Sequence, residues 1–292
     1  DGEITRNLTV DRVVVERSKS YGVHLDGWGT FTEASNKLWI QNGGSAKLPS
    51  AIRLEPGIAS TLPKTIALTG NVRDEILVRT NKTFMPDDTF VDRGVPYHVV
   101  GLLRVSPGKD NAPPAKLTIE AGVTLGFDAA VGAGIFVGDS QARQGVLQAV
   151  GTADKPIVFT SAAATKAAGD WAGLYFHSSP PGAGKISHAR IEYAGAANQS
   201  NGFGCGPADN ASAVFVEGFG PQGVGPSADF IQSTTFDNIG GTTVIVSGWV
   251  NDDGPNLTND NTFGTTVPSC KVSKPRRTGA GDVCDGGRTT CW

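Results

Sequence analysis

Short runs of apolar residues recur along this chain and give it a weak internal repeat. The runs are spaced by roughly 20 to 35 residues and close on Gly or Asn turns, a pattern typical of solenoid proteins. Clear examples are VVVERS with YGVHLDG (13–27), PIVFTS with GLYFHS (156–178) and AVFVEG (213–218). Because each coil of a solenoid packs only against its neighbours, the sequence predicts a rod with long, flat outer faces. A binding surface on such a rod consists of side chains stacked from coil to coil.

The composition favours an all-β fold. Of the 292 residues, 39 are Gly and 17 are Pro, and Gly is roughly twice as frequent as in ordinary proteins. No long stretch shows the apolar periodicity of a helix. We predict a right-handed parallel β-helix of about seven or eight coils over residues 1–265, with loop insertions at about 81–116 and 196–210. Residues 266–292, with three of the four cysteines, are predicted to form a C-terminal cap.

Charge and hydropathy argue against two classes of partner. The net charge is −3, whereas a nucleic-acid surface normally shows a clustered excess of basic residues. No apolar run approaches the ~20 residues that a membrane-spanning helix needs. We therefore expect no nucleic-acid partner and no membrane span.

Alternation within the strands predicts which side chains point into the rod, because successive residues of a strand face opposite sides. The expected inward set contains Leu174, Phe176, Val214, Val216, Val244 and Val246. The expected outward set contains Tyr175, His177, Phe215 and Ile245.

A longer echo links the two ends of the chain. VHLDGW (23–28) and VIVSGW (244–249) share Val, Gly and Trp at equal spacing. This similarity, and the lack of an obvious cap before the first coil, predict further β-helix coils N-terminal to Asp1, or a partner or loop that covers the first coil.

Several motifs resemble a known group of proteins. The stretch contains LTIEAGVTLGFD (117–128), GTADKPIVFTS (151–161), WAGLYF (171–176) and IEYAG (191–195). These runs are similar to those of bacterial exported right-handed parallel β-helix proteins. The resemblance is good over residues 94–195 and looser over 8–80 and 210–265. It implies a secreted or surface β-helix, often part of a larger anchored protein, and implies no particular activity.

Parallel β-helices include polysaccharide lyases and glycoside hydrolases, and an enzyme of either class would need side chains for acid–base catalysis. The acidic pair Asp87–Asp88 lies in a Pro-rich segment where Asp is a common turn former. The remaining candidates are His177, His188, Arg190 and Glu192. If their strands are neighbours, a histidine close to a glutamate would suit general acid–base catalysis. The alternative is that these side chains are merely solvated on a sheet face.

Aromatic side chains give the chain a candidate binding face. Rings on a flat outer face can stack on sugar rings through their apolar surfaces. The candidates for such contacts are Trp28, Trp171, Tyr175 and Phe215. The competing interpretation is that each Trp covers a corner of a coil.

No cofactor is predicted, although one segment could attract calcium. NDDGPNLTNDN (251–261) carries oxygen ligands around a Gly, with Asp252, Asp253 and Asp260 as candidates. It lacks the spacing and the terminal Glu of an EF-hand, and a turn rich in Asn explains it equally well.

The four cysteines are Cys205, Cys270, Cys284 and Cys291, and no CxxC pair occurs. We expect two disulfides and therefore an oxidising, extracellular or cell-surface location. Four cysteines allow three connectivities. We favour Cys284 with Cys291 or Cys270, and Cys205 joining its loop to the tail.

Three functions remain open from the sequence. The first is a non-catalytic exported or cell-surface protein that binds a polysaccharide or another surface through one face. The second is a polysaccharide lyase or glycoside hydrolase. The third is a structural spacer in a larger surface protein.

Overall fold

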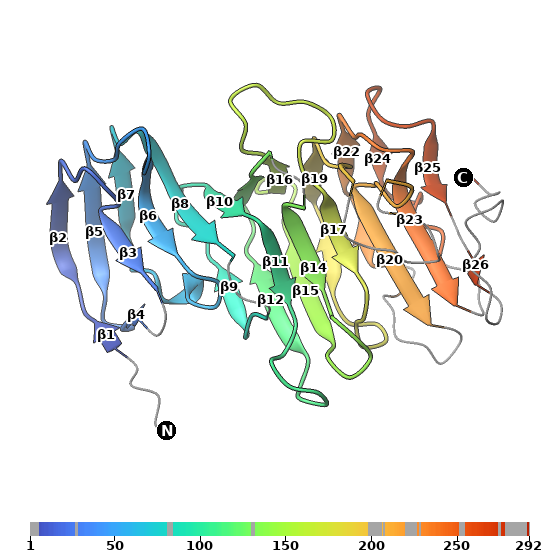
Figure 1. Ribbon diagram of the computed structural model, residues 1–292, viewed down its shortest axis with the longest axis horizontal. Helices are drawn as coiled ribbons and strands as arrows, with labels where there is room; N and C mark the ends of the chain where they lie inside the picture. Colours follow the sequence, from blue (N-terminus) through green and yellow to red (C-terminus); the bar gives the residue numbers. More distant parts are fainter. Residues whose placement is uncertain are drawn as a thin grey trace.

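The computed structural model describes residues 6–26, 29–80, 84–129, 132–197, 206, 208–219, 227, 229–250, 255–273, 276–277 and 291. These residues form parallel strands and one short helix, the 3-10 turn η1 (Ala59–Thr61). The strands stack along the long axis of the molecule from its N-terminal end to its C-terminal end (Figure 1). The predicted parallel β-helix is therefore confirmed.

The longest sheet, which we call sheet I, has nine strands, so the solenoid has nine levels rather than about seven or eight. From the N-terminal end these strands are β3 (Val23–Leu25), β6 (Ser50–Leu54), β8 (Arg73–Arg79), β10 (Tyr97–Val100), β13 (Thr124–Phe127), β16 (Ile157–Ser161), β19 (Ala189–Glu192), β22 (Thr235–Asp237) and β24 (Thr262–Phe263).

Two further sheets close the coils. Sheet II contains β11 (Leu102–Val105), β14 (Gly134–Val137), β17 (Gly173–Phe176), β20 (Val214–Phe219), β23 (Thr243–Val250), β25 (Cys270–Ser273) and, paired with β23, β26 (Arg276–Arg277). Sheet III contains β9 (Asp88–Phe90), β12 (Ala115–Ile119), β15 (Gly145–Val150), β18 (Lys185–Ser187) and β21 (Ile231–Gln232).

The N-terminal levels have smaller side sheets. One contains β2 (Asp11–Glu16), β5 (Asn36–Gln41) and β7 (Ile66–Thr69), and the other contains β1 (Arg6–Leu8) and β4 (Gly29–Phe31). From β9 to β23 the chain instead passes repeatedly through sheets III, I and II in that order. The cross-section of the solenoid therefore changes along its length.

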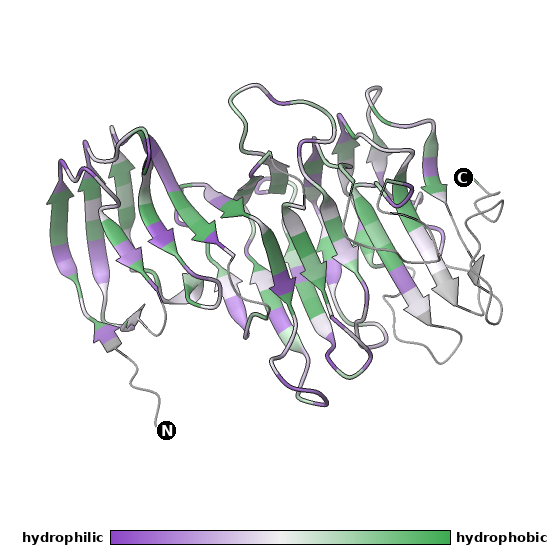
Figure 2. Ribbon diagram, viewed as in Figure 1, coloured by the Kyte–Doolittle hydropathy of each residue, from purple (hydrophilic) through white to green (hydrophobic). Residues whose placement is uncertain are grey.

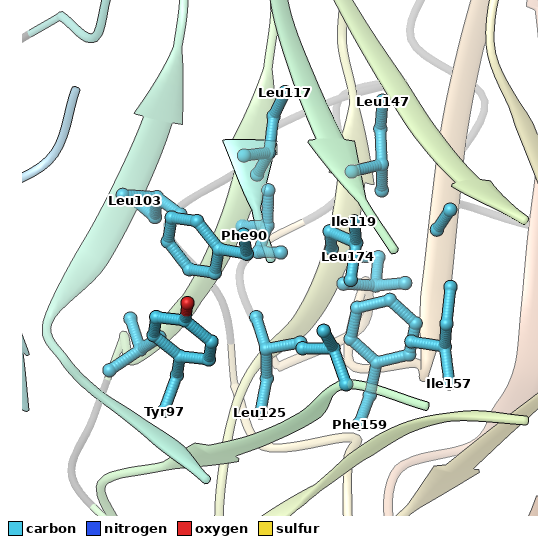
Figure 3. Packing of buried hydrophobic residues seen from close by; sticks show 14 of the residues in the cluster. Phe90, Tyr97, Leu103, Leu117, Ile119, Leu125, Leu147, Ile157, Phe159 and Leu174 are labelled. Atoms are coloured by element: carbon cyan, nitrogen blue, oxygen red, sulfur yellow. The ribbon is translucent and has the colours of Figure 1, made fainter. Parts of the chain in front are cut away.

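Ladders of apolar side chains fill the interior. In sheet I, the stacked residues Ile76, Tyr97, Leu125, Phe159 and Ile191 occupy equivalent positions on adjacent strands, and each is fully buried. Figure 3 shows how residues from the three sheets meet in this core. Figure 2 shows the corresponding change between hydrophobic and hydrophilic residues along the strands. Burial of these ladders is the main favourable contribution to folding.

The alternation prediction is correct for β20 and for Val244 of β23, and wrong for Ile245 and Val246 of β23. Val214 packs in the main core, while Phe215 lies in a separate cluster on the other side of sheet II. Ile245 pairs with Val214 and packs in the main core, and Val246 pairs with Phe215 and packs in the outer cluster. In a run with four consecutive apolar or small residues, alternation alone does not fix the register.

The segment 81–116 is more regular than the predicted loop insertion. Its described part, from residue 84, contains β9, β10 and β11, which belong to three different sheets. Phe90 and Tyr97 are fully buried, and their rings stack with centroids 4.8 Å apart (Figure 3). Asp88 begins β9, and the other Pro and Asp residues of this described part lie between strands.

One expectation about the ends of the chain is corrected. The echoing segments VHLDGW and VIVSGW are not equivalent, because β3 belongs to sheet I and β23 to sheet II. In the segment predicted as the C-terminal cap, β25 pairs with β23 at the C-terminal end of sheet II.

A disulfide joins Cys270 of β25 to Cys291. This bond contradicts our preferred pairing of Cys284 with Cys270 or Cys291. Cys205 and Cys284 lie outside the described residues. The sequence could not distinguish the possible pairings, because the spacing of the cysteines does not determine which of them lie close together in the fold.

Candidate functional site

The outer face of sheet I is hollowed where β13 passes between β10 and β16. His98, Gly126 and Thr160 occupy equivalent outward positions on these three neighbouring strands. Because Gly126 has no side chain, the row of outward side chains has a gap there. A groove of about 300 Å³ occupies the gap, and its walls include Arg73, Glu75, His98, Thr124, Thr160 and Lys166.

One wall of the groove is organised around a buried histidine. His98 is 6% exposed, and its Nδ1 lies 3.0 Å from Oε1 of Glu75. The hydroxyl of Ser50 donates to the same carboxylate over 2.6 Å. Nη1 of Arg73 lies 3.8 Å from it. The strands β6, β8 and β10 thus hold the carboxylate among three groups that favour its charged form.

The charge on Glu75 follows from this environment. Burial acts to raise the pKa of Glu75, but the hydrogen bonds from His98 and Ser50 and the positive charges of a protonated His98 and of Arg73 oppose it. The net effect lowers the pKa of Glu75 below its usual value. Glu75 is therefore a carboxylate at neutral pH and a permanent hydrogen-bond acceptor.

The other ring nitrogen of His98 is different. Nε2 is buried and has no hydrogen-bond partner among the described residues. The nearest carboxylate oxygen, Oδ1 of Asp128, lies 3.9 Å away, which is beyond hydrogen-bond distance. Since buried polar atoms are normally paired, this unpaired nitrogen needs an explanation.

The opposite wall is a chain of polar contacts. Lys166, on the loop after β16, donates from Nζ to the Thr160 hydroxyl over 3.0 Å. Thr160 in turn lies 3.4 Å from Oε2 of Glu192, which forms an ion pair with Arg190. Lys166 also sits over the ring of Tyr193, 5.5 Å from its centroid. Of the residues predicted from sequence, Glu192 therefore contacts Thr160 in the groove wall, and Arg190 contacts Glu192.

The two predicted histidines lie apart from the groove and from one another. His177 directly follows β17 of sheet II and hydrogen-bonds to Glu217. His188 occupies the turn between β18 and β19 with a φ of 48°, and its side chain is exposed. A site built on both histidines required their strands to be neighbours, and this condition is not met, because His177 follows β17 of sheet II whereas His188 lies between β18 of sheet III and β19 of sheet I.

The three aromatic candidates that the structure describes are buried and do not form an exposed face. Trp171 is 0% exposed and stacks on Phe127 with ring centroids 4.1 Å apart. Tyr175 and Phe215 point outward from sheet II as expected, but they are 2% and 1% exposed and pack together. Burial of these two rings is favourable because each removes a large apolar area from water. Trp28 lies outside the described residues.

The calcium prediction gains no support. Asp252 and Asp253 lie outside the described residues. Asp260 is exposed at a turn, with a φ of 59° that Asp tolerates well. Among the described residues, no three His, Cys, Asp or Glu side chains lie close enough together to hold a metal ion. Within the same part of the chain, no helix is long and apolar enough to cross a bilayer.

Sequence reasoning missed His98 and Glu75 as a pair. The alternation in YHVV places His98 outward, which was the available signal. Pairing it with Glu75 requires the register between β8 and β10, which joins Ile76 to Tyr97. Elsewhere in sheet I, paired positions on neighbouring strands are separated by many more residues along the chain, as Arg190 and Thr235 are. Such irregular spacing prevents the register from being counted along the sequence.

Comparison with known proteins supports the fold and assigns no activity. Residues 84–182 match the family model of the pectate-lyase like beta helix domain. The matched part includes His98, Gly126, Thr160 and Lys166 of the groove. No curated protein and no solved structure gives a significant match to the chain. This part of the chain is thus similar to pectate-lyase-like β-helix domains.

Proposed function

We propose that this protein binds a polysaccharide in the groove on the outer face of sheet I, as a non-catalytic exported or cell-surface protein. The observation that carries the proposal is the groove at Gly126, which is lined by charged and hydroxyl side chains on adjacent strands. Adjacent strands repeat about every 4.8 Å, so equivalent side chains form rows that a linear polymer can follow. Convergent polar groups of this kind commonly fix the orientation of a ligand.

The charges favour a sugar with an acidic group. Lys166 makes no ion pair within 4.0 Å to any described carboxylate, and the nearest charged contact of Arg73 is the 3.8 Å approach to Glu75. Both cations border the groove. A uronate carboxylate would give them a partner of opposite charge, with a charge-assisted hydrogen bond.

The disulfide supports the proposed location. Stable disulfides such as Cys270–Cys291 form mainly in oxidising compartments outside the cytosol. A position on a cell surface or outside the cell would also place the groove where polysaccharides occur.

Calorimetric titration with tetragalacturonate and cellotetraose tests the proposal. We expect tetragalacturonate to bind more tightly, and Lys166→Ala and Arg73→Ala each to weaken its binding by about fivefold to tenfold. Lys19→Ala, which removes an exposed lysine outside the groove, is the matched control and should bind like the unmodified protein. Equal losses in all three variants, or no binding of either sugar, would contradict the proposal.

Catalysis is the second candidate, and one observation favours it. His98 is held by Glu75 at the groove, which is the kind of pairing that orients a general base. The proposed binding function predicts that prolonged incubation with polygalacturonate or cellulose releases no shorter chains. Release of shorter products that stops in His98→Ala would establish a lyase or hydrolase instead.

A further inference from the structure

We propose that Glu75 fixes His98 with its proton on Nδ1, so that Nε2 is a hydrogen-bond acceptor and selects ligands that present a hydroxyl donor. This inference rests on the proposed function, because it assigns a specificity role within the same groove. It concerns His98, whose imidazole the sequence analysis did not connect to any partner.

The first step is the assignment of the proton on Nδ1. Oε1 of Glu75 lies 3.0 Å from Nδ1, and a carboxylate can only accept a hydrogen bond. A lone pair on Nδ1 would face the lone pairs of this oxygen, whereas a proton there makes a charge-assisted hydrogen bond. The longer contact from Nη1 of Arg73 to Nδ1, at 3.4 Å, would favour the opposite tautomer. We assign the proton to Nδ1 because the contact with the Glu75 carboxylate is shorter than the contact with Arg73.

The second step concerns Nε2. In the tautomer whose only ring proton is on Nδ1, Nε2 carries a lone pair. Nε2 is buried without a partner among the described residues, while its ring lines the groove. Arg73 and Glu75 contact the other ring nitrogen, Asp128 lies 3.9 Å from Nε2, and Lys166 lines the same groove.

The position of Asp128 agrees with a lone pair on Nε2. The Asp128 side chain is 45% exposed and could rotate toward the ring, yet its Oδ1 lies 3.9 Å from Nε2. A protonated Nε2 would attract this carboxylate to hydrogen-bond distance, whereas two acceptors repel one another.

The chemical consequence is selectivity between donors and acceptors. A sugar hydroxyl can donate its proton to Nε2 and replace the missing partner. A ligand with only an acceptor at that position would leave both atoms unpaired in a desolvated site, which costs affinity. His98 thus acts as a specificity-determining residue, and Glu75 is a positioning residue that acts through it.

The tautomer can be measured directly in the free protein. Long-range proton–nitrogen NMR spectra distinguish a protonated from an unprotonated ring nitrogen, and His98→Asn identifies the signals of His98. Near neutral pH we expect Nδ1 to carry the proton and Nε2 to be unprotonated. A proton on Nε2 in the unmodified protein would overturn the inference without any ligand being present.

Two variants of Glu75 link the tautomer to binding. Glu75→Met removes the acceptor at similar size and leaves Arg73 as the donor to Nδ1, so the proton should move to Nε2. Glu75→Gln is the matched control, because its amide oxygen can still accept from Nδ1. For tetragalacturonate we expect about a tenfold loss of affinity in Glu75→Met and less than about a threefold loss in Glu75→Gln.

The outcomes separate this inference from the proposed function. A moved proton with unchanged affinity in Glu75→Met would refute the selectivity while leaving sugar binding intact. Failure of the unmodified protein to bind tetragalacturonate and cellotetraose would instead refute the proposed function, and the NMR result would still decide the assignment of the acceptor. Both variants must unfold at temperatures close to that of the unmodified protein.

Discussion

Nδ1 of His177 lies 2.7 Å from Oε2 of Glu217 on the neighbouring strand of sheet II. The Glu217 side chain is 8% exposed and the His177 side chain 33% exposed. Phe136 stacks beside the imidazole, with ring centroids 5.9 Å apart. This pair ties two levels of the solenoid together and makes their attachment sensitive to pH.

The pair should make stability fall as the pH rises. The hydrogen bond to Glu217 raises the pKa of His177, burial opposes it, and the charges of Glu217 and Asp139 add to the increase. Because the folded pKa exceeds the unfolded value of about 6.5, the stabilisation is complete below that pH and is lost as the pH passes through the folded pKa. We expect Glu217→Gln to remove about 1 kcal/mol at pH 6 and much less at pH 9, since solvent weakens the pair.

Thermal unfolding from pH 6 to pH 9 measures this effect. His188→Asn is the control, because it removes an exposed histidine at a turn whose φ of 48° Asn tolerates. Its pH profile should match that of the unmodified protein. If the pH profile of Glu217→Gln also matches that of the unmodified protein, the His177–Glu217 pair contributes nothing to the pH dependence.

A second prediction concerns Asp88, whose carboxylate accepts hydrogen bonds from four backbone N–H groups. The donors are Gly57, Ala59, Ser60 and Thr89, at distances from 2.8 to 3.1 Å. Asp88→Ala leaves these groups without their acceptor, and we expect a loss of about 3 kcal/mol or more. Asp88→Asn retains one oxygen and should lose less. Urea unfolding measures both, and a loss below about 1 kcal/mol in Asp88→Ala would contradict this role.

How far the sequence could predict this fold depends on the range of the interactions. The strand pattern around Leu174 and Phe176 is local, and it correctly indicated a β-helix and the inward faces of β17 and β20. The His98–Glu75 pair depends on register across a turn of irregular length, which no local pattern encodes. The burial of Tyr175 depends on what covers the outside of sheet II. Alternation predicts only that its ring points outward.

The third prediction concerns the disulfide between Cys270 and Cys291. It closes a segment with a sequence separation of 21 and anchors β25, the last strand on the main path of sheet II. Chain-entropy arguments give about 3 kcal/mol for a loop of this size. We expect reduction, or the double replacement of both residues by Ala, to lower the unfolding temperature and to speed amide exchange in β25. Unchanged exchange there would show that β25 is held by pairing with β23 alone.

Trp171 carries the fourth prediction, because its indole has a structural role. The ring stacks on Phe127, and Nε1 donates to the backbone oxygen of Glu192 over 2.8 Å. Trp171→Phe keeps an aromatic stack and loses the hydrogen bond, so we expect a cost of about 1–2 kcal/mol. Trp171→Ala should cost about 3–5 kcal/mol. Denaturant unfolding measures these losses, and a negligible effect of Trp171→Ala would contradict its place in the core.

The last prediction compares two glycines with different roles. A Cβ added at Gly126 would lie 3.2 Å from Cβ of Ala162, and the backbone there lies outside the left-handed region. Gly126→Val should therefore fold with a loss of about 1 kcal/mol or less while filling the groove, so that tetragalacturonate binding falls at least tenfold.

At Gly138, φ is +73° and an added Cβ would lie 1.8 Å from the backbone oxygen of Ser178. Gly138→Ala should consequently cost several times more stability, at least about 3 kcal/mol, without touching the groove. Calorimetric titration and thermal unfolding of both variants separate the two effects. Full binding by a folded Gly126→Val protein would place the polysaccharide site elsewhere on the solenoid.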